Sequence, residues 1–513
     1  MRMRMRFVAG AAGAIVAVAA VATLVAASPS VRTRSAARPA AHATAHGFGG
    51  SSVVTSTYTL APTSTLTPTM TPTPTSTLTL TPTSTLTSTS TLTPTATLTL
   101  APTSTPSPMP TSTPTPPPIY LPITHRAVTD PTADRVAARL MAMLDRPGER
   151  DRLTVWDWEA GVALVALMTA YGDGRDPRVV AWVDGWLARA ARDGWVDLDA
   201  PALAIPNHIA PVWGALLRDA HFSDRRHDPL LAASRDWLMG TGRPAGAGRP
   251  VGATRVALPN RALGLPEDWP GAWAHLPDRP ELWDDTLFMT APFLARYGQR
   301  QGDAALVDEA ALQVLGHARI LADPVTGVWR HGWSQATGDH MSGGRWARGN
   351  AWAALAATEV LDSLPADSPL RPEVRLVLED QLAGLAKVQA SSGLWHTEVT
   401  RFDFYTETSG SAGIVAALYR AIAADWLSVS FRTAARKAAD LGFEGVTNRI
   451  AADGTVMRVS MGTGVPSAAQ GIALYNAIDA SRIQPYGQGL VLLMFEARER
   501  ADAALRNGGG RSP

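Results

Sequence analysis

Three glycine-containing turns at a regular interval constrain the fold of this chain more than any other feature. Gly327, Gly393 and Gly454 each follow a segment with helical periodicity, and they lie about 60 residues apart. At each turn glycine permits a tight reversal, from which a short extended stretch leads to the next helix. Six units of this length account for nearly all of residues 128–507. The repeat therefore predicts an all-α fold, an (α/α)6 barrel in which six helical hairpins close into a ring.

Apolar residues at helical spacing support this prediction. Twelve segments show the pattern, near residues 131–147, 156–171, 177–193, 208–220, 228–239, 283–299, 303–322, 346–363, 370–390, 408–425, 430–444 and 486–504. Several carry alanine at close-packing positions, which lets neighbouring helices approach. Such a ring has a mouth formed by loops and helix ends, and we expect a ligand to bind there.

The region before the barrel has a different composition. Residues 1–6 alternate methionine with arginine, and an uncharged run rich in Ala and Val follows to Ala27. This pattern predicts a signal peptide or a membrane anchor over residues 1–28. Residues 39–125 contain no Asp, Glu, Lys or Arg and are rich in Thr, Pro and Ser, so residues 29–127 are predicted to be a disordered linker. A catalytic domain over 128–507 and a disordered tail over 508–513 complete the predicted organisation.

These features predict an exported bacterial protein, extracellular or at the cell surface, with membrane association if the anchor is retained. The formal net charge is +1 and no basic block stands out, so nucleic acid is not an expected partner. The chain has no cysteine, which excludes disulfides, thiolate catalysis and Cys-based metal sites.

Known motifs for other chemistries are missing from the sequence. It has no His-Glu-x-x-His pattern, no EF-hand loop, no phosphate-binding glycine loop and no nucleophile elbow. We therefore expect no metal and no cofactor. The chemistry that remains is acid–base catalysis by carboxyl groups on a polar, anionic sugar.

The stretch from Trp283 to Leu294 is the strongest candidate for that chemistry. Asp284 and Asp285 stand beside Trp283 at the head of an apolar helix. A helix N-terminus favours an ionised carboxylate, whereas burial and repulsion between the two carboxylates raise the pKa that a general acid needs. We interpret Asp285 as the catalytic acid. The alternative interpretation is that the acidic pair only caps the helix.

A second group of candidates lies around a loop-to-helix junction that contains His331, Trp346, Arg348 and Trp352. Tryptophan faces stack on sugar rings, and a guanidinium group binds a carboxylate through two parallel hydrogen bonds. These residues therefore suit a site for an acidic sugar. The alternative is that the tryptophans belong to the core and Arg348 caps a helix. Trp158, at the head of an early helix, is a further candidate for the wall of the cavity.

Taken in chain order, these motifs resemble those of a known family. They are Trp283-x-Asp285-Thr286-Leu287-Phe288-Met289, His331-Gly332-Trp333, Trp346-x-Arg348-Gly349-Asn350-x-Trp352, Gly393-Leu394-Trp395 and Glu407-Thr408-Ser409. They are similar to motifs of the unsaturated rhamnogalacturonyl hydrolases, glycoside hydrolase family 105, which is related to the unsaturated glucuronyl hydrolases of family 88. The resemblance covers most of residues 150–500 and implies the same (α/α)6 barrel.

The resemblance also implies a reaction. The substrate would be an oligosaccharide with a 4,5-unsaturated uronic acid at its non-reducing end. Asp285 would protonate C4 of this vinyl ether and then, as a carboxylate, take a proton from the water that adds at C5. By the same resemblance, His331 would contact substrate or water, Arg348 the uronate, and Trp346 and Trp352 the sugar faces.

One departure from the family pattern concerns Asn207 and His208. Family members usually carry an aspartate there, which assists the catalytic acid. Its role would pass to Asp284 or His208, or else substrate choice or activity differs. Two other functions stay open: another carbohydrate-active enzyme with the same ring, such as a lyase, an epimerase or a conventional glycosidase, and a catalytically silent sugar-binding protein of the cell surface. The sequence does not define the sugar that follows the uronate or the oligomeric state.

Overall fold

The computed structural model describes residues 128–172, 174, 176–240 and 252–508. This part of the chain is mostly helical. Its α-helices are α2 (Pro131–Ala142), α3 (Trp158–Tyr171), α4 (Pro177–Arg192), α5 (Ile209–His221), α6 (Asp228–Met239), α7 (Asp284–Gln301), α8 (Ala304–Leu321), α9 (Ala347–Ser363), α10 (Arg371–Lys387), α11 (Thr408–Ala423), α12 (Val429–Thr447), α13 (Ala473–Ala477) and α14 (Pro485–Gly508). Short 3-10 helices are η1 (Met143–Asp145), η2 (Arg150–Leu153), η3 (Pro206–His208) and η4 (Asn260–Leu263). Each of the twelve predicted helices is present, and only α13 was not predicted.

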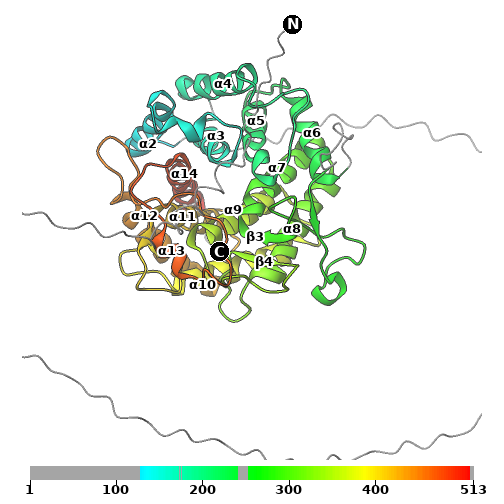
Figure 1. Cartoon of the computed structure of the whole chain (residues 1–513). Coiled ribbons are helices and arrows are strands. Elements are labelled where there is room, and N and C mark those ends of the chain that lie inside the picture. The colour runs from blue at the N-terminus through cyan, green and yellow to red at the C-terminus, as the bar shows by residue number, and fades with distance from the viewer. Residues whose placement is uncertain (1–127, 173, 175, 241–251, 509–513) are drawn as a thin grey trace, which may run out of the picture. The chain divides into compact units, whose positions relative to one another are not determined.

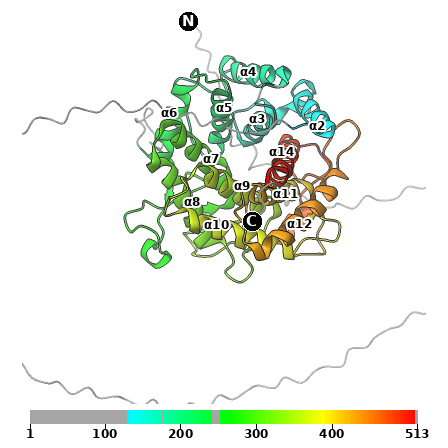
Figure 2. The same cartoon turned by 180° about the vertical axis from the view of Figure 1, so that it is seen from behind.

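Six of these helices form a closed inner ring (Figures 1 and 2). In chain order, α3, α5, α7, α9, α11 and α14 each pack against the next, and α14 packs against α3. The other long helices, α2, α4, α6, α8, α10 and α12, lie outside this ring, each against at least one inner helix. The predicted ring of helical hairpins is therefore confirmed for the described residues.

Local chemistry explains where several helices begin and which faces they bury. Asp130, Asp157, Asp176 and Asp303 are N-cap residues whose carboxylates accept hydrogen bonds from first-turn amides. The inner helix α3 is buried on all sides over residues 159–171. The outer helix α4 buries one face only. This difference is the one expected between a ring of core helices and an amphipathic outer layer.

The three glycines of the sequence repeat occupy equivalent places in the fold. Gly327, Gly393 and Gly454 have φ angles of +75°, +81° and +86°. A Cβ atom at these positions would lie 2.3, 2.1 and 2.2 Å from a backbone carbonyl oxygen of α10, α12 and α2, respectively. Each turn thus packs against the next outer helix of the ring. Both the positive φ and this close approach require glycine.

Three short two-stranded antiparallel sheets lie in the connections. β1 (Arg255–Val256) pairs with β2 (Ala272–Trp273), β3 (Glu281–Trp283) with β4 (Gly332–Ser334), and β5 (Trp395–His396) with β6 (Thr406–Glu407). β3 leads directly into α7, and β6 leads directly into α11. A bridge between Trp346 and Glu398 fixes the start of α9 in the same way. Extended pairing therefore holds the N-termini of three consecutive inner helices.

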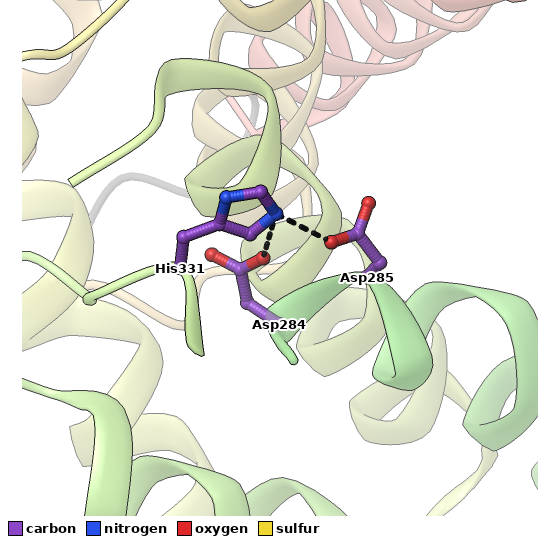
Figure 3. Close-up of side chains that lie close together, drawn as sticks. All are labelled: Asp284, Asp285 and His331. Carbon is purple, nitrogen blue, oxygen red and sulfur yellow. Dashed lines mark hydrogen bonds and ion pairs between the residues drawn. The ribbon is translucent and has the colours of Figure 1, made fainter. Parts of the chain in front are cut away.

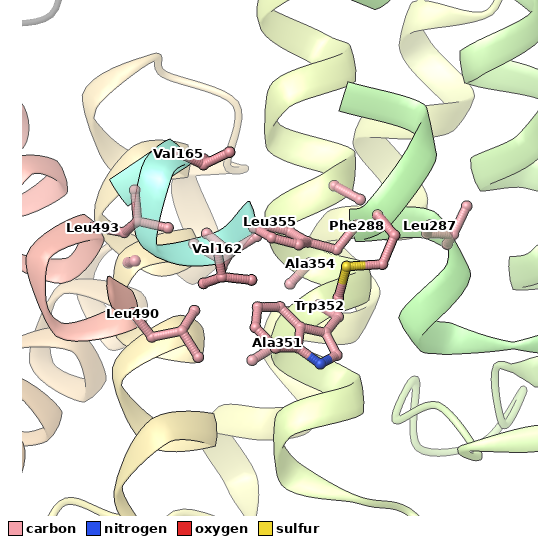
Figure 4. Close-up of a cluster of buried hydrophobic side chains, with 14 of the residues drawn as sticks. Val162, Val165, Leu287, Phe288, Ala351, Trp352, Ala354, Leu355, Leu490 and Leu493 are labelled. Atoms are coloured by element: carbon pink, nitrogen blue, oxygen red, sulfur yellow. The ribbon is translucent and has the colours of Figure 1, made fainter. Parts of the chain in front are cut away.

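The centre of the ring is filled by side chains from facing inner helices (Figure 4). Val162 and Val165 of α3, Leu490 and Leu493 of α14, and Phe288 of α7 are all buried there. Small residues let the helices approach: a Cβ at position 413 in α11 would lie 2.6 Å from the Ala351 Cβ in α9. Because these side chains fill the middle of the ring, we place a ligand of the ring at one of its ends.

The predicted signal peptide or anchor (1–28), the predicted linker (29–127) and residues 509–513 of the predicted tail lie outside the described residues. Among the helices that are described, none combines the length and the apolar character needed to cross a membrane.

Candidate active site

The candidate catalytic aspartates open helix α7, and strand pairing places a histidine beside them. Trp283, the last residue of β3, pairs with Gly332 of β4. The backbone N–H of Asp284 then donates a 3.0 Å hydrogen bond to the carbonyl oxygen of His331. Two segments almost 50 residues apart in the sequence are joined here, so the position of His331 is set by the same strand pair, β3–β4, from which α7 begins.

The side chains of Asp284, Asp285 and His331 form a compact trio (Figure 3). His331 Nε2 lies 2.9 Å from Asp285 Oδ2 and 3.9 Å from Asp284 Oδ1. On the other side of the ring, His331 Nδ1 lies 2.8 Å from the Tyr475 hydroxyl. A carboxylate can only accept hydrogen bonds, so Nε2 carries the hydrogen that it donates to Asp285. In the neutral ring, Nδ1 then accepts from Tyr475.

The two aspartates differ sharply in environment. The Asp284 side chain is fully buried and neither carboxyl oxygen has a hydrogen-bond partner. Burial raises the pKa of Asp284 well above its usual value, and the adjacent Asp285 carboxylate raises it further. The Asp285 side chain remains 13% exposed.

Asp285 has the opposite ionisation preference. Burial acts to raise the pKa of this carboxyl group too. The hydrogen bond from His331 outweighs that effect, with help from the positive charge of Arg348, and lowers the pKa of Asp285 below its usual value. At rest the pair therefore consists of a neutral acid at 284 and a carboxylate at 285.

Arg348 lies next to the trio but is fully buried. Its guanidinium donates to the hydroxyl and carbonyl oxygens of Ser460, to the Met461 carbonyl and to the hydroxyls of Ser409 and Thr463, at 2.6–3.4 Å. A carboxylate oxygen of Glu407 lies 3.7 Å from the guanidinium and carries the opposite charge. The guanidinium thus binds the segment 460–463, and its positive charge also acts on Asp285.

The predicted tryptophans divide into two groups. Trp346 is 1% exposed and packs between His331 and the Arg348 guanidinium. Trp352 is fully buried against Phe288. In these positions neither offers a free face to a sugar, and both support the site from behind. Trp158 is half-buried, like Trp283 at the start of α7.

His208 belongs to a neighbouring cluster. Its carbonyl oxygen accepts from Trp156 Nε1 at 3.0 Å, and its Nδ1 lies 3.4 Å from the Ala204 amide. Its charge, together with a hydrogen bond from Asn207, acts on Asp157, although burial has the larger effect and raises the pKa of Asp157. The structure therefore couples His208 to the cap of α3.

Sequence reasoning missed two side chains of the site. His275 stacks on Trp283 with ring centres 4.3 Å apart and planes at 9°, and its Nδ1 lies 3.0 Å from the Thr286 hydroxyl. Burial lowers the pKa of His275 to about 4, so the ring is neutral. The second residue is Tyr475, which orients His331. His275 lies in a connection after β2 and Tyr475 in the five-residue helix α13, and neither segment is long enough for a periodic pattern to mark a residue as functional from the sequence.

The possible ligand atoms of Asp284, Asp285 and His331 all lie within 4.8 Å of one another. This spacing suits a shared proton, and the same spacing is compatible with a cation. However, the N-terminus of α7 carries positive partial charge, which disfavours a cation there. The neutral state of Asp284 acts in the same direction. We therefore assign the trio to proton transfer.

Comparison with known proteins bears on the site as a whole. Residues 132–501 match the model of Glycosyl Hydrolase Family 88. The unsaturated rhamnogalacturonyl hydrolase YesR of Bacillus subtilis strain 168 is 28% identical over 337 residues, which cover 66% of this chain and 88% of that protein.

Solved structures show the same architecture. A possible member of the GH105 family from Salmonella enterica serovar Paratyphi A is 26% identical, with a TM-score of 0.58 over 73% of this chain and 93% of that one. A family 105 glycoside hydrolase from C. acetobutylicum is 20% identical, with a TM-score of 0.57 over 71% of this chain and 99% of that one. The second likeness concerns the fold alone.

Proposed function

The chain belongs to Glycosyl Hydrolase Family 88 and is a glycoside hydrolase, and on this premise we propose that it acts on oligosaccharides with a 4,5-unsaturated uronic acid at the non-reducing end. The observation that carries the proposal is the Asp285 carboxyl group. It is the exposed member of the trio at the head of α7. YesR, whose name specifies an unsaturated rhamnogalacturonyl substrate, supports this class.

The reaction follows from the chemistry of the ring double bond, which is a vinyl ether. Asp285 in its protonated form gives a proton to C4, and positive charge develops at C5 and the ring oxygen. Water adds at C5 and loses a proton to the Asp285 carboxylate. The resulting hemiketal opens and releases the remaining sugar. One carboxyl group serves as acid and then as base, so no second carboxylate at the spacing of an ordinary glycosidase is required.

Other residues support this reaction from defined positions. His331 holds Asp285 in place through its 2.9 Å hydrogen bond. The positive charge of Arg348, which acts on Asp285, favours an anionic substrate over a neutral one. The half-buried rings of Trp158 and Trp283 are the proposed sugar contacts. Gly462 and Gly464 lie close to these rings, since a Cβ at these positions would lie 3.7 and 3.6 Å from them.

We also propose that the enzyme is exported and acts outside the cytoplasm. The basic and apolar composition of residues 1–28 and the charge-free Thr/Pro/Ser composition of residues 39–125 support this location. N-terminal sequencing of the mature protein would show whether residues 1–28 are removed or retained as an anchor.

The decisive test is turnover of unsaturated disaccharides prepared by lyase digestion of pectin and of glycosaminoglycans. The wild type should remove the ultraviolet absorbance of the double bond, and Asp285→Asn should lose this activity by about 10³-fold or more, because it removes the only proton donor at C4. Asp425→Asn, an exposed aspartate with 71% side-chain exposure, is the matched control and should retain activity. Retained activity in Asp285→Asn would refute the assignment.

Mass spectrometry of the products separates the proposed reaction from its alternatives. Hydrolysis adds one water to the unsaturated substrate, whereas a lyase creates a new double bond in a saturated one, and an epimerase leaves the mass unchanged. Saccharide binding without turnover of any substrate would instead indicate a binding protein.

A further inference from the structure

The fully buried Asp284 carboxyl group has no role in the reaction as described so far. It sits on the first residue of α7, and both of its oxygens lack hydrogen-bond partners. A buried polar group in this state costs about 1–3 kcal/mol, and more if it is charged. The backbone amides of Asp284 and Asp285 act to lower the pKa of this carboxyl group, but neither forms a regular hydrogen bond with it, so helix capping does not account for the cost.

The fold makes room for this carboxyl group. Gly349 in α9 faces it, and a Cβ at position 349 would lie 2.3 Å from Asp284 Oδ2 and 2.4 Å from Oδ1. Any side chain at 349 would displace the carboxyl group. The opposite direction leads to His331 Nε2 at 3.9 Å, and from there to Asp285 at 2.9 Å. Asp284 is therefore held against a glycine on one side and directed toward the catalytic pair on the other.

The resting protonation of Asp285 differs from the one that the reaction needs. The reaction needs a proton on Asp285, but the hydrogen bond from His331 favours the carboxylate at that position. Resting on the proposed function, we propose that Asp284 stores the proton that Asp285 gives to the substrate, with His331 as the relay between them.

The transfer balances in protons. The Nε2 proton of His331 moves to Asp285 Oδ2, and the Asp284 proton replaces it on Nε2, so Asp284 becomes the carboxylate and Asp285 the acid. Asp285 then protonates C4 and recovers a proton from the water that adds at C5. The reverse relay returns this proton to Asp284 after product release. An anionic uronate next to Asp285 drives the first step, because negative charge disfavours a carboxylate there.

The charged and titratable groups around Asp284 come from several elements. Asp285 on α7, His331 before β4 and Tyr475 on α13 interact with Asp284, whereas Arg348 on α9 and His275 after β2 interact with Asp285. Burial raises the pKa of Tyr475 well above its usual value, so it stays neutral. His275 is neutral as well. The one proton that distinguishes resting from active states therefore belongs to the Asp284–His331–Asp285 trio.

Asp284→Asn in the full chain tests this proposal through the pH dependence of kcat/KM. In the wild type the trio keeps its proton to high pH, because Asp284 holds it. In the variant the proton rests on Asp285 alone, so activity should be lost at lower pH. The alkaline limb of the pH profile, where kcat/KM falls as pH rises, should shift to lower pH by about one unit or more. Asp425→Asn should leave the limb in place. A merely structural role for Asp284 would lower kcat or stability without moving the limb, and that outcome would overturn the proposal.

Infrared spectroscopy tests the stored proton without turnover. At neutral pH the wild type minus Asp284→Asn difference spectrum should contain the carbonyl stretch of a protonated carboxylic acid. Glu159, whose pKa burial raises to about 7, cancels in this difference. Asp285→Asn should keep the band and lose activity. If Asp285→Asn keeps activity, the proposed function is wrong, but the band still shows whether Asp284 is protonated. Absence of the band from the wild type refutes proton storage.

Discussion

Gly349→Ala is a direct probe of the contact between α9 and the Asp284 carboxyl group. Glycine inside a helix is less stable than alanine by about 0.5–1 kcal/mol, so the substitution would stabilise the protein if the new methyl group met nothing. At 349 it meets the carboxyl group at 2.3 Å, where ordinary contact begins at 3.4 Å. Overpacking of this kind costs about 1–3 kcal/mol. The net expectation is destabilisation of up to about 2 kcal/mol.

Gly185→Ala is the matched control. Gly185 also lies inside a helix, α4, and its Cβ position has no atom within 4 Å. This variant should gain about 0.5–1 kcal/mol, so the two alanine variants should differ by about 1–3 kcal/mol in the free energy of unfolding measured by urea denaturation. If both variants have the same stability, the close contact at 349 does not exist as described.

The same substitution should affect catalysis. To accept the methyl group, the Asp284 carboxyl must move by roughly 1 Å, and misplacement of this size at a site costs up to about 10²-fold in rate. We expect kcat of Gly349→Ala to fall by about ten- to a hundredfold, while Gly185→Ala keeps wild-type kcat. Wild-type kcat in Gly349→Ala would refute a role for the position of Asp284.

A double-mutant cycle identifies the carboxyl group as the cause. Asp284→Ala removes the atoms that meet the new methyl group, so adding Gly349→Ala to this background should restore the helix gain instead of a loss. The interaction energy between the two positions should be about 1–3 kcal/mol. Additive effects of the two substitutions would show that the stability loss arises elsewhere in α9.

Two further predictions concern stability. Burial raises the pKa of Glu159 from 4.5 to about 7, so the folded state binds this proton more tightly than the unfolded state. The free energy of unfolding should therefore fall by about 3 kcal/mol as pH rises from 4.5 to 7. In Glu159→Gln, the free energy of unfolding measured by urea denaturation should change less with pH over this window. Arg420, 2% exposed, lies between the buried carboxylates of Glu359 and Glu496. Arg420→Met should cost about 3–5 kcal/mol because it removes a cation from a buried network. Arg178 is 78% exposed beside Asp176, so Arg178→Met should cost far less, and equal losses would contradict the argument.

The fold could be predicted from the sequence because its signals are local and repeated. Helical periodicity marked the twelve long helices, and the glycine turns gave the unit length of the ring. Gly327, Gly393 and Gly454 are glycines for two reasons that act at every repeat, a positive φ and contact with the next outer helix. Such a signal recurs with the architecture and remains visible without any knowledge of tertiary contacts.

The environment of individual site residues could not be predicted in the same way. Trp346 and Trp352 were expected to contact sugar faces, yet Trp346 is buried against His331 and Arg348, and Trp352 against Phe288 of another helix. Arg348 was expected to face the uronate, and its hydrogen bonds go to a segment more than 100 residues away. Residue types in a motif indicate a kind of chemistry, but the packing of the helices determines which of these side chains remain accessible.

The two aspartates show how one helix start can hold two different acids. Consecutive residues of a helix point about 100° apart, so the Asp284 carboxyl is fully buried against Gly349 of α9 while the Asp285 side chain stays 13% exposed. The same helix N-terminus acts on both. Burial without a hydrogen-bond partner keeps the proton on Asp284, and the hydrogen bond from His331 favours the carboxylate at Asp285. A pair whose proton affinities are separated in this way is suited to a reaction in which one carboxyl group must act first as an acid and then as a base.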